Sequence, residues 1–160
     1  YYEMHNLTHN YRICDFQCAL GRSQLSKLEK FIDRRNYLSG IYSKELLKKI
    51  PELVKPLYLR KSITSAYHLF VVRINFNQLN GGRAALMMFL QKYGIQTQVN
   101  YMPIYMHPYY QNYFKNSIEF PMAEKYYDEC LSLPLFPSMK DSDPIDVVKI
   151  LAEGIKKLQY

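Results

Sequence analysis

The longest stretch of helical periodicity lies near the start of this 160-residue chain, at residues 15–50. Apolar side chains recur there with helical spacing and form one stripe: Leu25, Leu28, Ile32, Leu38, Ile41 and Leu46. Gly21 and Gly40 interrupt the stripe and allow the helix to bend, whereas Pro51 and Pro56 end it. The pattern therefore predicts a long N-terminal helix that can bend at either glycine.

The middle of the chain alternates between strand and helix signals. Residues 67–76 are rich in aromatic and β-branched side chains and give the clearest strand prediction. Asn80 is a suitable N-cap for a helix that runs through Tyr93 and that Gly94 ends. Residues 95–101 predict a second strand.

The last third of the chain begins with an irregular stretch, residues 102–117, which holds two prolines and four tyrosines. Pro121 suits the first turn of a short helix that ends near Leu131, and residues 133–137 are expected to be extended. A final helix opens at Asp143 and carries an apolar stripe of Ile145, Val148, Ala152 and Ile155. Helices segregated from a small sheet predict an α+β fold.

Composition fits one globular domain that is large enough to bury a core, since 48% of the residues are apolar. The net charge of +7 makes nucleic acid a candidate partner. However, the lysines are scattered through the predicted helices, and no RNP, zinc-finger or basic-arm pattern is present. A solvated basic surface with no nucleic-acid partner is therefore favoured, and a basic nucleic-acid-binding domain is the alternative.

The cysteines indicate a reducing, cytoplasmic compartment. Cys14, Cys18 and Cys130 are odd in number and include no C-x-x-C pair, so we expect small buried side chains and no metal site. No apolar run approaches the roughly 20 residues of a membrane span, so no membrane partner is expected. Because the first residue is Tyr and not Met, we expect the chain to be a piece of a longer protein.

A compact polar cluster stands just before the long helix. Asn10, Tyr11 and Arg12 supply an amide, a phenol and a guanidinium, and Asp15 can cap the helix that follows. Hydrogen-bond donors at a helix start suit an anion such as a phosphate. The alternative is a surface turn that only begins a helix.

A second candidate site lies in the loop after residues 95–101. A strand would deliver Tyr101 and the imidazole of His107 into a polar, aromatic loop, and loops placed by a rigid strand are frequent binding sites. His107 could orient or neutralise a ligand anion, or it could simply pack among tyrosines. His68 lies inside the first predicted strand, so we interpret it as structural.

Matching motifs then occur in a fixed order along most of the chain. They are Asn10-Tyr11-Arg12, Ala19-Leu20-Gly21, Tyr67-His68-Leu69-Phe70, Gly94-Ile95, Val99-Asn100-Tyr101, His107-Pro108-Tyr109-Tyr110, Phe120-Pro121-Met122-Ala123-Glu124 and Leu131-Ser132-Leu133-Pro134-Leu135. These motifs resemble the DegT/DnrJ/EryC1/StrS family of nucleotide-sugar aminotransferases. Within the family, the Gly-Ile-Gln-Thr-Gln-Val and Tyr-x-His-Pro-Tyr-Tyr stretches are most similar to the branch that acts in pseudaminic acid synthesis.

The resemblance implies a fold-type I enzyme that uses pyridoxal 5′-phosphate (PLP) and acts as a homodimer. Residues 1–14 would be a loop entering from a large domain outside this chain, and residues 15–160 would form the small C-terminal domain. The lysine that forms a Schiff base with PLP would lie in the large domain. No lysine of this chain matches its motif, so we assign no catalytic residue and expect the chain alone to be inactive.

The resemblance also implies specific roles. Asn10 would contact the PLP phosphate of the neighbouring subunit, Arg12 would meet a substrate phosphate, and Tyr101 and His107 would border the sugar-nucleotide pocket. The amino group would pass from glutamate to a UDP-linked 4-keto-6-deoxy sugar, in pseudaminic acid or related surface-glycan synthesis. Asn100 departs from the histidine that is frequent at its position. The alternative function is a noncatalytic remnant of a split or truncated gene.

Overall fold

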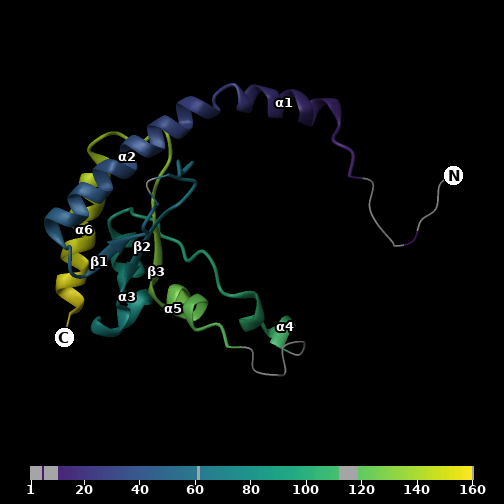
Figure 1. Cartoon of the computed structure of the whole chain (residues 1–160). Coiled ribbons are helices and arrows are strands. Elements are labelled where there is room, and N and C mark those ends of the chain that lie inside the picture. The colour runs from purple at the N-terminus through teal and green to yellow at the C-terminus, as the bar shows by residue number, and fades with distance from the viewer. Residues whose placement is uncertain (1–4, 6–10, 61, 112–118, 160) are drawn as a thin grey trace.

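Residues 5, 11–60, 62–111 and 119–159 are described by the computed structural model of the chain. Helices are packed on a small three-stranded sheet (Figure 1), which confirms the predicted α+β class. Residues 11–14 have no regular structure, and most of the predicted entering loop at 1–14 lies outside the described residues. The boundary between that loop and the domain therefore stays a prediction.

Two consecutive helices, α1 (Asp15–Leu25) and α2 (Leu28–Lys49), replace the single predicted helix. The break falls at residues 26–27, whereas both glycines at which a bend was expected lie inside helices. The Ser26 hydroxyl donates to the Ser23 carbonyl oxygen at 2.9 Å, and such a side-chain bond competes with the helical ladder. Cys14, not Asp15, is the N-cap of α1, and its backbone N–H donates to the Gln17 side chain at 3.1 Å.

The sheet is antiparallel, in the order β1 (Val54–Pro56), β2 (Phe70–Ile74) and β3 (Cys130–Leu133). The β2 strand falls inside the predicted 67–76 stretch. The β3 strand lies where the end of a helix was expected, because helix α5 (Pro121–Glu129) stops one residue before it. Residues 133–137, predicted to be extended, contain only the last residue of β3.

One core joins the sheet to helices α2, α3 (Gly82–Lys92) and α6 (Asp143–Leu158). Alternate β2 residues Phe70, Val72 and Ile74 point into it, as the two-residue period of a strand requires. Tyr42 of α2 is fully buried, stacks on Phe70 at 4.7 Å between ring centroids, and donates its hydroxyl to the Pro134 carbonyl oxygen at 2.8 Å. Burial raises the pKa of the Tyr42 phenol, which keeps it a donor.

Three local predictions differ from the structure. Helix α3 is capped by Gly81, which has a φ of 77°, and not by Asn80. Residues 95–101 form no strand, and their one backbone pairing with the sheet is the bridge between Gln98 and Ser132. Helix α6 buries a face centred on Val148 and Leu151, so Ile145 of the predicted stripe is exposed.

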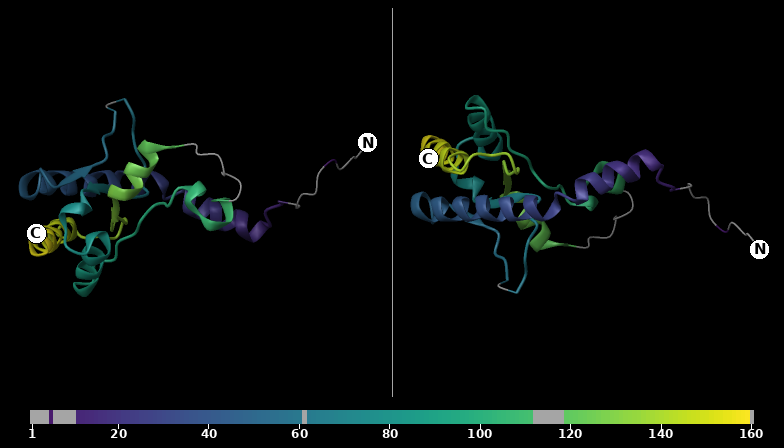
Figure 2. Two further views of the ribbon diagram at one scale, coloured as in Figure 1. Left: turned by 90° about the horizontal axis from the view of Figure 1, so that it is seen from below. Right: turned by 90° about the horizontal axis from the view of Figure 1, so that it is seen from above.

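Helix α1 runs away from the sheet and its packed helices, as the views in Figures 1 and 2 agree. None of its residues is buried. Cys14 and Cys18 are exposed and Cys130 is buried, so the expectation of three buried thiols holds for Cys130 alone. In the described part of the chain, no helix is long and apolar enough to cross a membrane.

Candidate functional site

The segment that carries Tyr101 and His107 is anchored to the sheet by β3. The backbone N–H of Gln98 donates to the Ser132 carbonyl oxygen at 3.2 Å, and the N–H of Ser132 donates back to the Gln98 carbonyl oxygen at 2.8 Å. Beyond Gln98 the chain leaves the sheet and continues as a loop. The loop therefore starts from a fixed point at the edge of the sheet.

Asn100 supplies a second anchor for the same loop. It is buried, and its Oδ1 accepts a hydrogen bond from the Ser132 hydroxyl at 2.6 Å. Its carbonyl oxygen accepts a hydrogen bond from the Tyr126 hydroxyl of α5 at 3.3 Å. Asn100 thus points inward and holds the loop.

The loop then presents Tyr101 and His107 to solvent. Tyr101 is 72% exposed and His107 is also exposed. The His107 carbonyl oxygen accepts the N–H of Tyr110 and Gln111, which fixes the start of α4 (Pro108–Gln111). Both predicted side chains are therefore on one segment, exposed and available to a ligand.

Contacts with α5 and with its N-cap residue, Phe120, hold the outer part of this loop. The Tyr105 hydroxyl donates to Glu124 Oε1 at 3.2 Å, and the Tyr105 ring lies 4.9 Å from that of Phe120. Partial desolvation and the Glu124 carboxylate raise the pKa of the Tyr105 phenol, so it remains the donor of this bond. The loop is thereby fixed at its start by β3 and further along by α5.

Replacing Ser132 with Ala should loosen this loop. The change removes the donor to Asn100 Oδ1 and leaves a buried acceptor unsatisfied, which should cost about 1–2 kcal/mol of unfolding free energy. Amide hydrogen exchange over residues 98–111 should accelerate more than exchange in α2 and α6. The matched control is Ser138→Ala at an exposed serine after β3, which should change neither quantity. Equal exchange in the two variants would contradict the anchoring role.

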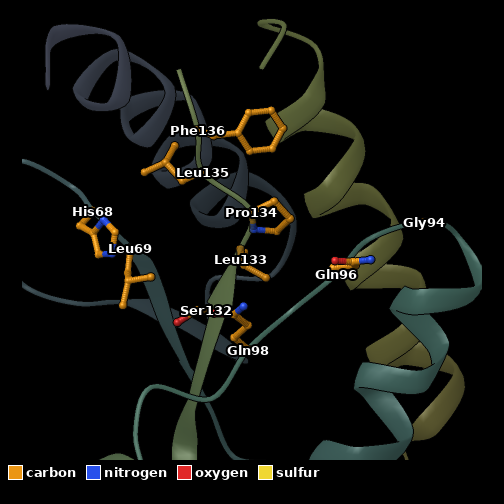
Figure 3. Close-up of a pocket in the computed structure, with 10 residues that line it drawn as sticks. All are labelled: His68, Leu69, Gly94, Gln96, Gln98, Ser132, Leu133, Pro134, Leu135 and Phe136. Atoms are coloured by element: carbon orange, nitrogen blue, oxygen red, sulfur yellow. The ribbon is translucent and has the colours of Figure 1, made fainter. Parts of the chain in front are cut away.

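A cavity of about 380 Å³ adjoins the same anchor. Figure 3 shows His68 and Leu69 on one side, the end of β3 and residues 133–136 along the middle, and Gln96 and Gln98 on the segment after α3. His68 precedes β2 and is exposed, so its interpretation as a structural residue inside a strand is wrong. The imidazole, amide and hydroxyl groups around this cavity suit hydrogen bonding to a polar ligand.

The structure does not bring Arg12 to this loop. Arg12 is exposed and lies just before α1, and Figure 1 shows α1 well apart from α4. Within the described part of the chain Arg12 forms no ion pair, so its guanidinium is available to an anion. Asn10 lies outside the described residues. No cluster of three potential metal-binding side chains occurs among the described residues.

Comparison with known proteins gives consistent matches over nearly the whole chain. The sequence profile of the DegT/DnrJ/EryC1/StrS aminotransferase family matches residues 1–152. Spore coat polysaccharide biosynthesis protein SpsC of Bacillus subtilis is 34% identical over 158 residues, which are 98% of this chain and 40% of SpsC. Uncharacterized protein MJ1066 of Methanocaldococcus jannaschii is 35% identical over 159 residues, which are 96% of this chain and 41% of that protein.

Solved structures show the same fold. Helicobacter pylori PseC, described as an aminotransferase in pseudaminic acid biosynthesis, superposes with a TM-score of 0.84 at 25% identity, over 98% of this chain and 41% of PseC. DesV of S. venezuelae superposes with a TM-score of 0.82 at 24% identity, over 99% of this chain and 41% of DesV. The chain spans about two fifths of the length of these relatives. It belongs to the DegT/DnrJ/EryC1/StrS aminotransferase family.

Proposed function

We propose that this chain is the C-terminal part of a PLP-dependent aminotransferase that moves an amino group from glutamate to a UDP-linked 4-keto-6-deoxy sugar. The observation that carries the proposal is the family match over residues 1–152, together with the superposition on PseC over 98% of this chain. Similarity to PseC favours a role in pseudaminic acid or related surface-glycan synthesis, as a UDP-4-amino-4,6-dideoxy-N-acetyl-β-L-altrosamine transaminase.

In this proposal the chain binds and orients, while PLP, when bound, supplies the electron sink for amino transfer. Asn10 and Arg12 donate hydrogen bonds to phosphate oxygens, Asn10 to the PLP of a partner subunit and Arg12 to the substrate. The planar guanidinium of Arg12 offers two parallel donors to a phosphate, which fits that task. Its exposure and its lack of an ion pair in the described residues support this assignment.

Tyr101 and His107 take the sugar side of the proposed site. Both are exposed on a loop whose start is fixed by Gln98 and Asn100, so the loop can present them in a constant geometry. Their phenol and imidazole can donate to or accept from sugar hydroxyls. The exposed thiols of Cys14 and Cys18 support the proposed cytoplasmic location.

The test is a hybrid enzyme in which this chain replaces the matching stretch of B. subtilis SpsC. The hybrid should bind PLP and form a 4-amino sugar from glutamate and a UDP-linked 4-keto-6-deoxy sugar. This chain alone is the control, because none of its lysines matches the PLP-binding motif. Incubated with PLP and borohydride, it should yield no stoichiometric lysine adduct. A specific adduct on the chain alone, or a folded, PLP-loaded hybrid without aminotransferase activity, would contradict the proposal.

A further inference from the structure

Helix α5 supports the loop of Tyr101 and His107 but has little hydrophobic burial of its own. None of its nine residues is buried, and Tyr126 and Tyr127 are only half-buried. Most helices in a protein owe their stability to an apolar face packed on the core. The position of α5 therefore depends strongly on the polar contacts that reach it from the rest of the domain.

Arg83, at the start of α3, makes several of these contacts. Its guanidinium donates a hydrogen bond to the carbonyl oxygen of Tyr127 and, at 3.4 Å, another to that of Cys130. The last carbonyl groups of a helix have no partner within the helix and attract cations. The guanidinium also lies 4.9 Å from the centroid of the Tyr127 ring and 5.6 Å from that of the Phe76 ring. Arg83 thus joins α3 to the C-terminal end of α5.

Arg73 of β2 makes a second contact at the same end of α5. Its Nε donates to Glu129 Oε2 at 2.7 Å, and its Nη2 donates to the same oxygen. Arg83, by contrast, forms no ion pair among the described residues, so its contacts are with carbonyl oxygens and ring faces. Both arginines therefore act where α5 ends at Glu129 and β3 begins at Cys130.

The same helix end is directly connected to the loop. The Tyr126 hydroxyl donates to the carbonyl oxygen of Asn100, the residue before Tyr101. Burial raises the pKa of the Tyr126 phenol, so it remains the donor of this bond. One turn earlier in α5, Glu124 accepts the hydroxyl of Tyr105. A displacement of α5 would therefore disturb two of the contacts that hold the loop.

We propose that Arg83 is a positioning residue for the sugar side of the proposed site. By holding the C-terminal end of α5, it keeps Tyr101 and His107 in the geometry that a sugar nucleotide requires, without touching the substrate itself. Figure 1 shows α5 between α3 and α4, the helix in which the loop ends. The ligand's identity rests on the proposed function, whereas control of the loop by Arg83 is a property of this chain alone.

Hydrogen exchange in this chain alone tests the control of the loop. Arg83→Met removes the charge and the donors but keeps a long side chain. Amide exchange over α5 and residues 100–111 should accelerate about tenfold, whereas exchange in α2 and α6 should stay nearly unchanged. Arg83→Lys keeps a cation near the same carbonyl groups and should recover part of the protection. The matched control is Lys92→Met, which removes an exposed cation from the last turn of the same helix.

Kinetics of the SpsC hybrid test the consequence for the substrate. Arg83→Met should raise the KM for the UDP-linked 4-keto-6-deoxy sugar about tenfold and leave kcat and PLP affinity nearly unchanged. A residue that only stabilised the fold would lower the amount of active enzyme, and thus the apparent kcat, without changing KM. Arg83→Lys should return the KM toward that of the unaltered hybrid, and Lys92→Met should change none of these quantities.

The possible outcomes separate this inference from the proposed function. Exchange that accelerates equally in all helices of the Arg83→Met variant would overturn the inference, because Arg83 would then stabilise the whole domain. An unchanged KM in an active Arg83→Met hybrid would also overturn it and leave the function intact. If the unaltered hybrid binds PLP but has no aminotransferase activity, the proposed function fails. Faster exchange confined to α5 and the loop would then still support the positioning role of Arg83.

Discussion

Replacing Gly154 with Val should lower the free energy of unfolding by about 3 kcal/mol, because α3 and α6 pack in contact at this residue. A Cβ at Gly154 would stand 2.6 Å from Phe89 Cδ1 and 3.0 Å from Leu86 Cδ1. To make room, the Phe89 ring must shift and disturb its contacts with Tyr93, at 5.1 Å between ring centroids, and with the Lys157 ammonium, 5.9 Å from its centroid. Chemical denaturation of the chain, followed by circular dichroism, measures the effect.

The matched control is Gly40→Ala. Gly40 is an exposed residue inside α2, and a Cβ added there would meet no atom within 4 Å. Alanine should therefore raise the stability by up to about 1 kcal/mol through helix propensity alone. Replacing the Phe89 ring with the smaller side chain of leucine (Phe89→Leu) should recover part of the unfolding free energy that the Gly154→Val variant loses. If Gly154→Val is as stable as the parent chain, α3 and α6 do not pack as described.

Prediction of the fold from sequence succeeded where local composition decides the structure. The β2 strand and helix α6 each carry their own signal, β-branched residues in one and an apolar period with a proline start in the other. The β1 strand has only three residues and includes Pro56, so nothing in its own sequence marks it as a strand. It exists because Val54 pairs with Ile74 of β2.

At residues 95–101, by contrast, the sequence predicted a strand that the structure does not contain. Their composition favours a strand, but only Gln98 pairs with the sheet, because Asn100 turns inward to Ser132 and the chain departs. That hydrogen bond joins residues 32 positions apart in the sequence. Propensity cannot reveal a contact between residues so distant, and the long-range partner overrides the local preference.

In the candidate site, too, the sequence identified only the residues that lie in the matching motifs. Tyr101 and His107 could be named from the motifs around them, and the structure places both on one exposed loop. The residues that hold this loop, Ser132 and Tyr126, come from β3 and α5. Tyr126 lies in none of the matching motifs, and the motif that contains Ser132 does not indicate a contact with Asn100. His68 was not predicted to line a cavity, because the residues around it in sequence favour a strand and His68 was placed inside that strand.

Replacing Asn10 with Ala in the SpsC hybrid should weaken PLP binding by roughly ten- to hundredfold. The amide is proposed to donate a hydrogen bond to a charged phosphate oxygen, and such bonds contribute about 1.5–3 kcal/mol. Arg12→Ala is the matched comparison two residues away. Because Arg12 is assigned to the substrate phosphate, its loss should raise the KM for the UDP-sugar and leave PLP affinity nearly unchanged. Titration of each apo-hybrid with PLP, followed by fluorescence, gives the PLP affinity, and initial rates at varied UDP-sugar give the KM; the two measurements together separate the two roles.

Subunit mixing tests whether Asn10 acts on the partner's cofactor. One hybrid subunit carries Asn10→Ala, and the other lacks the PLP-binding lysine of its SpsC part. At a PLP concentration that saturates the unaltered hybrid but lies below the weakened Kd of the Asn10→Ala variant, each homodimer should have little activity. In a mixed dimer, the intact lysine of the first subunit faces the intact Asn10 of the second, so one complete site forms. Activity should therefore recover toward half that of the unaltered hybrid. If Asn10 instead served its own subunit, neither site would be complete, and mixing would restore nothing.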